Sequence, residues 1–148
     1  MSAEPAGHIE RSSRRSCERL WARHKYLVLS KSQASYRAIR AYLKSASPEQ
    51  QELERLIAEA VALPEDRGAV INALQHVWGY FKRRVDEAEK RQFFALLGEY
   101  EHGRTGQSEV CTFLRELLKR YPDEYLNASS FLHSGRSDSS EAPDLPGA

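Results

Sequence analysis

The chain has 148 residues, of which 41% are hydrophobic and 29% are charged, and its formal net charge is +1. This composition is that of a soluble globular protein with one modest hydrophobic core, and the length excludes two ordinary domains. No apolar run approaches the ~18 residues that a membrane span needs, and residues 1–15 lack the apolar stretch of a secretory signal peptide, so we expect a cytoplasmic protein.

The apolar residues of the first half recur at helical spacing, and no segment shows the two-residue alternation of a strand. One apolar stripe spans residues 29–43, and residues 30–32 are a candidate break that divides it into two helices. The next helix is predicted to begin at Ser47, which can cap the first turn, followed by Pro48, which fits that turn. This helix is expected to end at Leu63-Pro64.

The second half of the chain carries the most apolar stripe, in residues 70–81, which predicts a central helix. Asp86 and Glu89 resemble a capping box, which begins another helix. Gly103 follows the last apolar position of that helix and is typical of a helix C-terminus.

Two further helices complete the prediction. Ser108 opens one that ends at Pro122, and a short last helix runs from Asp123 to about residue 132. We therefore expect an all-α protein, a single compact bundle of about five to six helices. The expected parts are a flexible basic N-terminus over 1–15, a helical domain over 16–132 and a disordered tail over 133–148.

The net charge hides a strong asymmetry along the chain. Between residues 11 and 44 there are ten basic residues and one acid, Glu18, a surplus of nine positive charges. Residues 45–66 hold six acids and only Arg55. Such segregation indicates a face that binds polyanions, although a solvated charged surface is the commonest alternative for a run of charges.

Two basic ridges are expected in this segment. Arg37, Arg40 and Lys44 repeat at helical spacing and form the first ridge. The second ridge is expected if residues 11–23 are helical, because arginine recurs there at every fourth position: Arg11, Arg15, Arg19 and Arg23. Aromatic residues are interleaved with the basic ones over residues 24–37, which suits a nucleotide, because cations bind phosphate and rings stack on unpaired bases.

A polar row is predicted on one face of the central helix, where steps of four, three and four separate Asn72, His76, Gly79 and Arg83. A mid-helix glycine weakens a helix by ~1 kcal/mol relative to alanine, so Gly79 is expected to let something approach closely. One interpretation is a ligand groove in which Asn72 and His76 orient a substrate and Arg83 meets a phosphate. The other is that Gly79 admits a neighbouring helix and His76 is a satisfied core histidine.

The sequence holds no self-contained catalytic or metal-binding motif. Cys17 and Cys111 lie far apart and outside any Cys/His cluster, so we expect neither a disulfide framework nor a zinc or iron–sulfur site, and no bound cofactor. Cys111 is expected in the core, whereas the arginines around Cys17 raise the alternative of a lowered thiol pKa and a reactive cysteine. No Ser/His/Asp order or Gly-rich phosphate loop is present.

Three segments, taken together, resemble the motifs of the YbgA-like family. They are His24-Lys25-Tyr26 through Ser32-Gln33 and Tyr36-Arg37, then Asn72 through Phe81, and Tyr121-Pro122-Asp123-Glu124-Tyr125-Leu126. They match the family's three motifs in the same order, over roughly residues 17 to 132. Many members of the family have a proline-containing apolar stretch before the penultimate helix. In this chain residues 105–109 stand there instead, and they contain no proline.

The resemblance implies a context in RNA chemistry. Members of the family occur alone or fused to an iron–sulfur desulfidase domain that removes sulfur from thiolated uracil, including thiouridine in tRNA. A desulfidase partner would hold the cluster while this chain holds the RNA. Both tRNA and the desulfidase are implied by the resemblance alone.

We therefore expect a nucleic-acid-binding accessory module without catalytic chemistry of its own. The alternatives are a small helical enzyme or nucleotide-binding protein centred on His76, Asn72 and His24, and a purely protein-binding module. The residues expected to bind nucleic acid are Arg23, His24, Lys25, Lys31, Ser32, Gln33, Tyr36, Arg37, Arg40, Lys44, Asn72, His76, Tyr80 and Arg83.

Overall fold

The computed structural model describes residues 6–45 and 47–133, with side chains from Ser12 onward. The predicted tail therefore lies outside the described residues from 134 to its end, as do residues 1–5. The described part of the chain is helical and contains no strand, which confirms the all-α prediction. No helix in that part is long and apolar enough to cross a membrane.

Seven helices follow one another along the chain. They are α1 (Ala6–Lys31), α2 (Gln33–Leu43), α3 (Gln50–Val61), α4 (Arg67–Trp78), α5 (Glu87–Glu101), α6 (Gln107–Arg120) and α7 (Glu124–Ala128). One more helical turn covers residues 130–133. The described chain thus has six long helices and two short ones, slightly more than the predicted five to six.

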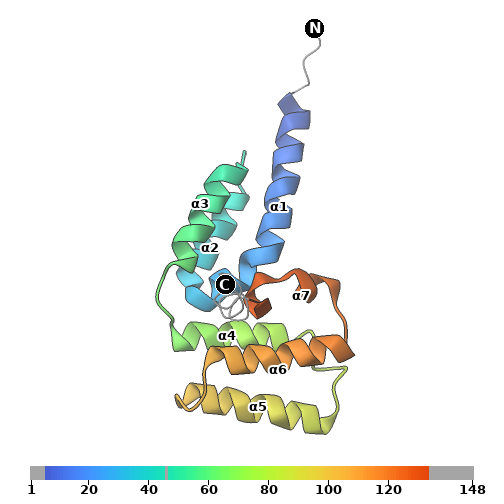
Figure 1. The fold of residues 1–148 in the computed structure, drawn as a ribbon. Coiled ribbons are helices and arrows are strands. Elements are labelled where there is room, and N and C mark those ends of the chain that lie inside the picture. The colour runs from blue at the N-terminus through green and yellow to red at the C-terminus, as the bar shows by residue number, and fades with distance from the viewer. Residues whose placement is uncertain (1–5, 46, 134–148) are drawn as a thin grey trace, which may run out of the picture.

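Helix α1 is the element around which the others are arranged. Its 26 residues reach about 39 Å at 1.5 Å per residue. Helices α2 and α3 pack beside it, and α4 crosses near its C-terminal end (Figure 1). Helices α4, α5 and α6 form the other part of the molecule, and α7 returns the chain to α1.

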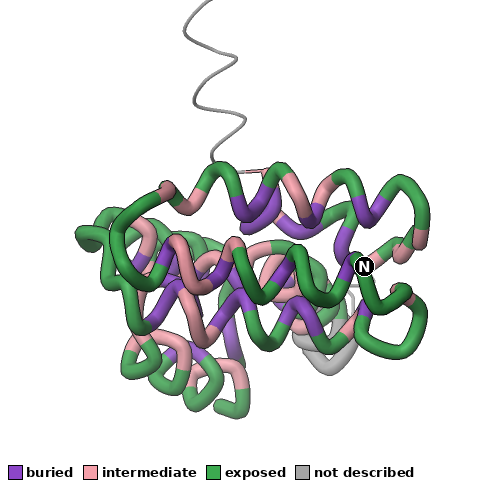
Figure 2. The backbone as a smooth tube through the Cα atoms, turned by 90° about the horizontal axis from the view of Figure 1, so that it is seen from below, coloured by how far each residue is buried: buried purple, intermediate pink, exposed green. Residues whose placement is uncertain are grey.

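The buried residues form two clusters, and α1 contributes to both. The smaller, which we call the α2–α3 cluster, contains Cys17, Val28, Ile39, Leu53, Ile57 and Ala60. The larger, which we call the main cluster, includes Tyr26 and Leu29 of α1 together with Trp78, Phe93, Tyr100, Leu114 and Phe131. The buried positions lie on the faces that the helices turn toward one another (Figure 2).

Local sequence signals set several helix ends as predicted. Ser32 separates α1 from α2, and its Oγ accepts a hydrogen bond from the backbone N–H of Ser35 at 3.0 Å. Asp86 and Glu89 form the predicted capping box at the start of α5. Helix α5 ends before Gly103, whose φ of 74° lies in the left-handed region that favours glycine.

Two other predicted boundaries are wrong. Ser47 does not cap α3. The N-cap position belongs to Glu49, which makes no side-chain cap, and its backbone N–H donates to the Tyr42 hydroxyl at 2.7 Å. The predicted last helix is interrupted, because Ser129 has extended backbone with a ψ of 124°. Helix α7 therefore ends at Ala128.

Residues 6–15, expected to belong to a flexible N-terminus, are helical and form the first turns of α1. Ser13 Oγ donates to the Pro48 carbonyl at 2.9 Å, and the Arg14 guanidinium donates to the Leu43 carbonyl at 2.9 Å. These bonds hold this part of α1 against the segment between α2 and α3. The boundary expected after residue 15 thus lies inside a helix.

Candidate nucleic-acid interface

Six basic side chains in α1, in α2 and at the C-cap of α2 are exposed and have no carboxylate partner among the described residues. We call these six the cationic set: Arg15, Arg19, Arg23, Arg37, Arg40 and Lys44. Within the described part of the chain none of the six forms an ion pair. Glu18 is the sole acid between residues 12 and 44. The side chain of Arg11, the first residue of the predicted series, is not described. These charges are available to an anionic ligand.

Tyr36 is less available for base stacking than predicted. Its ring is half-buried and its centre lies 5.5 Å from that of Trp21 on α1. The guanidinium carbon of Arg40 lies 5.9 Å from the centre of the Tyr36 ring. Tyr36 therefore joins α1 to α2, while Arg37 extends into solvent.

Three tyrosines, one from each of the three sequence motifs, meet in space and form what we call the tyrosine cluster. The ring centre of Tyr26 lies 6.1 Å from that of Tyr80 and 6.4 Å from that of Tyr125. The centres of Tyr80 and Tyr125 are 6.1 Å apart. Lys25 Nζ lies 5.3 Å from the Tyr26 ring centre and 5.2 Å from that of Tyr125. Segments far apart in the sequence therefore build one cluster.

The tyrosine cluster has a buried side and a partly exposed side. Tyr26 is buried and its hydroxyl lies 3.0 Å from that of Tyr80. Burial, reinforced by this hydrogen bond, raises the pKa of Tyr26 far above its usual value, so the phenol is neutral. Tyr80, Tyr125 and Lys25 are half-buried. Partly exposed rings beside a cation are suited to an unpaired base.

A pocket of ≈ 600 Å³ lies between α1 and the C-terminal segment, and we call it the α1–C-terminal pocket. Its lining residues are Arg23, His24, Asn127, Ala128, Ser129, Ser130 and His133. His24 Nδ1 lies 2.8 Å from Ser130 Oγ, and the Ser130 hydroxyl donates to the Arg23 carbonyl at 3.3 Å. Burial, with a smaller effect of the Arg23 charge, lowers the pKa of His24, so its ring is neutral at neutral pH.

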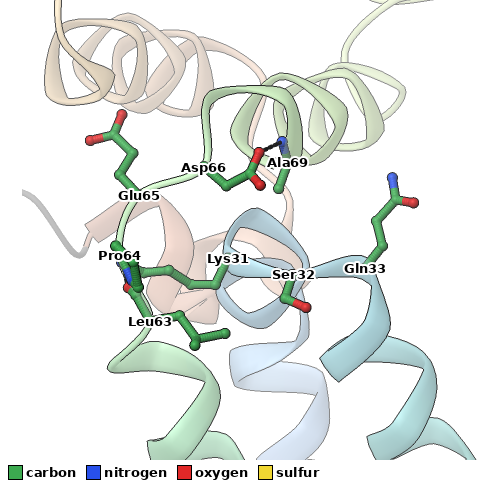
Figure 3. Close-up of a pocket in the computed structure, with 8 residues that line it drawn as sticks. All are labelled: Lys31, Ser32, Gln33, Leu63, Pro64, Glu65, Asp66 and Ala69. Carbon is green, nitrogen blue, oxygen red and sulfur yellow. Dashed lines mark hydrogen bonds between the residues drawn. The ribbon is translucent and has the colours of Figure 1, made fainter.

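A second pocket, of ≈ 530 Å³, lies between the α1–α2 junction and the loop before α4 (Figure 3). Its lining residues are Lys31, Ser32, Gln33, Leu63, Pro64, Glu65, Asp66 and Ala69. Lys31 Nζ donates to the Leu63 carbonyl at 3.1 Å, and Asp66 Oδ1 accepts from the Ala69 backbone N–H at 3.0 Å. The side chains of Lys31 and Asp66 thus serve the fold, and the carboxylates of Glu65 and Asp66 make this acidic pocket unsuited to phosphate.

The predicted polar row of the central helix is only partly formed. Helix α4 ends at Trp78, and Gly79 is its C-cap with a φ of −54°. Gly79 is exposed, and among described atoms a Cβ there would meet only the His76 carbonyl oxygen, at 3.1 Å. The predictions of a mid-helix glycine and of a neighbouring helix packed against it are therefore wrong. His76 is exposed, which excludes the core-histidine interpretation.

Asn72 and Arg83 complete the predicted row. Asn72 is half-buried on α4, and Arg83 is exposed in the turn that follows this helix. No described hydrogen bond, ion pair or ring contact joins Asn72, His76 or Arg83 to the α1–C-terminal pocket or to the tyrosine cluster. The predicted binding residues are therefore distributed over several surfaces.

Both cysteines are buried thiols. Cys17 belongs to the α2–α3 cluster, and burial raises its pKa although Arg14 acts in the opposite direction. Burial raises the pKa of Cys111 to about 12. The alternative of a reactive Cys17 is therefore wrong. Within the described ranges no group of three or more His, Cys, Asp or Glu residues is placed to hold a metal ion.

Several residues of these surfaces were not predicted. Tyr26 and Tyr125 lie within the first and third motifs, so their presence in those motifs was a usable signal. Asn127, Ser130 and His133 carry no local pattern that indicates a site. They reach the α1–C-terminal pocket only because the chain folds back onto α1.

Comparison with known proteins places these motifs in a wider context. Residues 25–134 match a family described as "Protein of unknown function (DUF1722)". The chain is 23% identical to the "Uncharacterized protein YbgA" of Escherichia coli (strain K12) in an alignment of 116 residues that covers 74% of this chain and 69% of that protein. No solved structure matches the chain. The matched range includes all three residues of the tyrosine cluster.

Proposed function

The chain belongs to the YbgA-like family of proteins of unknown function, and from this premise we propose that it is an RNA-binding accessory domain without catalytic chemistry of its own. The observation that carries the proposal is the cationic set, whose six side chains are exposed and unneutralised within the described chain. Release of counterions from phosphates by such side chains supplies much of the affinity of nucleic-acid-binding proteins.

The tyrosine cluster supports RNA over other polyanions. Folded RNA presents unpaired bases that stack on aromatic rings, whereas a stiff duplex offers mainly its phosphates. Tyr80 and Tyr125 are half-buried and Lys25 lies beside Tyr125, so a base and its phosphate have partners within one cluster. This arrangement favours a structured RNA with exposed single-stranded nucleotides.

The proposed RNA is a tRNA, and the proposed protein partner is an iron–sulfur thiouridine desulfidase. Both come from the family resemblance, in which related domains accompany such an enzyme. In this arrangement the chain holds the RNA and the partner supplies the cluster that removes sulfur. The chain itself is expected to bring no cofactor to the reaction.

The test is the salt dependence of tRNA binding by a variant that lacks three charges of the cationic set, Arg37→Gln, Arg40→Gln and Lys44→Gln. We expect weaker binding and a flatter plot of log affinity against log salt, with each lost phosphate contact reducing the slope by ~0.7 to 0.9. Fluorescence anisotropy over a series of salt concentrations measures both quantities.

A matched control removes three charges elsewhere, with Lys82→Gln, Lys90→Gln and Arg91→Gln. These three side chains are exposed and lie beyond α1 and α2, so the control has the same net charge as the first variant. The control should keep most of the affinity. Equal affinity and equal slope in the wild type and in the first variant would refute the proposal.

A further inference from the structure

The two larger pockets described above differ in the charge of their linings. Glu65 and Asp66 line the acidic pocket beside α4. Among the described residues that line the α1–C-terminal pocket there is no carboxylate, and one of them is Arg23. Arg23 is exposed and forms no ion pair in the described chain. Of these two pockets, the α1–C-terminal pocket is therefore the one whose lining admits an anion.

One ring nitrogen of His24 is engaged within the protein. Its Nδ1 lies 2.8 Å from Ser130 Oγ, which also lies 3.3 Å from the Arg23 carbonyl oxygen. Nε2 is the other hydrogen-bonding atom of the neutral ring. The residues that line the pocket thus include a cation and a neutral hydrogen-bonding ring.

The side chain of Asn127 adds both kinds of hydrogen-bonding group. It is exposed in the pocket lining, and its amide makes no hydrogen bond to another described residue. The backbone carbonyl of Asn127 accepts from His133 Nε2 at 3.2 Å. The amide is therefore available to a ligand, while the backbone contact holds the end of the segment.

A smaller pocket of ≈ 310 Å³ also lies beside α1, and Arg23 lines both this pocket and the α1–C-terminal pocket. Its other lining residues are Ser16, Arg19, Leu20 and Gln50. Two cations one helical turn apart thus connect the two depressions. A polyanionic strand that enters the larger pocket has a path over Arg19.

We infer that the α1–C-terminal pocket takes the phosphate-bearing terminal nucleotide of an RNA strand, with Arg23 on the phosphate and the rest of the strand along α1. This inference rests on the proposed RNA-binding function and names the part of the RNA that is recognised. A volume of ≈ 600 Å³ is within the usual range for a small-molecule site. A terminal phosphate carries nearly two charges and three acceptor oxygens, more than a phosphate within the strand.

The probe is a short single-stranded oligouridylate prepared in three forms, with a 5′-phosphate, with a 3′-phosphate and with neither. We expect one phosphorylated form to bind about tenfold more tightly than the unphosphorylated form, as for one charge-assisted interaction. The form that gains affinity identifies which end enters. Equal affinity of all three forms would overturn the inference.

The diagnostic variant is Asn127→Asp, which places a carboxylate in the pocket. It should abolish the tenfold preference, because the new charge repels the terminal phosphate, and the fold should persist because the side chain is exposed. Gln51→Glu makes the same change in net charge on the exposed face of α3 and should keep the preference. A preference that survives in Asn127→Asp would place the phosphate elsewhere.

These outcomes separate the inference from the proposed function. If the three forms bind equally and the Arg37/Arg40/Lys44 variant loses affinity for all of them, RNA binding holds and the terminal site is refuted. If none of the RNAs binds, both the RNA-binding function and the terminal-phosphate site are refuted. If the preference for a terminal phosphate is present, is lost in Asn127→Asp and is kept in Gln51→Glu, both the RNA-binding function and the terminal-phosphate site are supported.

Discussion

Glu89 is a buried carboxylate that joins the start of α5 to the end of α6. It accepts the backbone N–H of Asp86 at 2.9 Å and the hydroxyl of Tyr121 at 2.8 Å, and it pairs with Arg120. These contacts, the backbone bond most of all, lower the pKa of Glu89. Tyr121 opens the third sequence motif. The buried charge therefore holds this motif against α5.

We predict that Glu89→Gln lowers the thermal stability at neutral pH, because a buried hydrogen-bonded charge is removed. The pKa of Glu89 is lower in the folded than in the unfolded chain, so its charge stabilises the fold above the unfolded pKa. This contribution is lost as the pH falls through the folded pKa. The melting temperatures of wild type and variant should therefore converge in acid.

Glu87→Gln is the control for this prediction, since Glu87 is exposed in the same first turn of α5. It should change the melting temperature little. A difference between wild type and Glu89→Gln that is the same at neutral and at acidic pH would show that the charge of Glu89 contributes nothing.

The candidate site could be predicted from the sequence only in part, and the reason is visible in single residues. Arg23 and His24 lie in a local run of basic and aromatic residues, which indicates nucleotide binding without knowledge of the fold. Ser130 is 106 positions from His24. No local pattern relates two residues that meet only through tertiary folding.

At the scale of helices, the predicted ends were correct where neighbouring residues determine them. Ser32 and the capping box of Asp86 and Glu89 satisfy backbone groups within their own turns. The start of α3 was mispredicted because Tyr42 of the preceding helix meets the Glu49 N–H. Similarly, Ser13 and Arg14 in the first part of α1 bond to Pro48 and Leu43, which lie far along the chain.

Ser32→Ala tests whether this residue is a cap. We expect a loss of about 1 kcal/mol in the free energy of unfolding, since the backbone N–H of Ser35 loses its acceptor. Urea unfolding followed by circular dichroism measures the change. RNA affinity of the folded protein should be retained, because the hydroxyl is already engaged by the helix.

Ser12→Ala is the matched control for Ser32→Ala, since Ser12 is exposed within α1. Alanine is the better helix former there, so stability should not fall. Unchanged stability of Ser32→Ala together with weaker RNA binding would instead assign Ser32 to the interface.

At the scale of the whole molecule, α1 belongs to both buried clusters. Val28 faces the α2–α3 cluster, and its neighbours in α1, Tyr26 and Leu29, face the main cluster. Because the helix is rigid, loss of packing on one of its sides also weakens the packing on its other side. The two halves of the described chain should therefore unfold as one cooperative unit.

The two tryptophans allow this to be measured, because Trp21 packs on the α2–α3 cluster and Trp78 lies in the main cluster. The Trp78→Phe variant keeps Trp21 as the fluorescent reporter of the α2–α3 cluster. The Trp21→Phe variant keeps Trp78 as the reporter of the main cluster. Within each variant, the urea midpoint from fluorescence should equal that from circular dichroism. Separate midpoints would mean that the clusters unfold independently.

Charge segregation between neighbouring helices has a kinetic consequence. Helix α3 packs beside α1 and α2, and its segment, residues 45–66, carries six acids against Arg55. The cationic set and these acids give the molecule an electric dipole. On the proposal that RNA is the ligand, this field turns an approaching strand toward α1 and α2 before contact. Added salt would then slow association far more than it speeds dissociation.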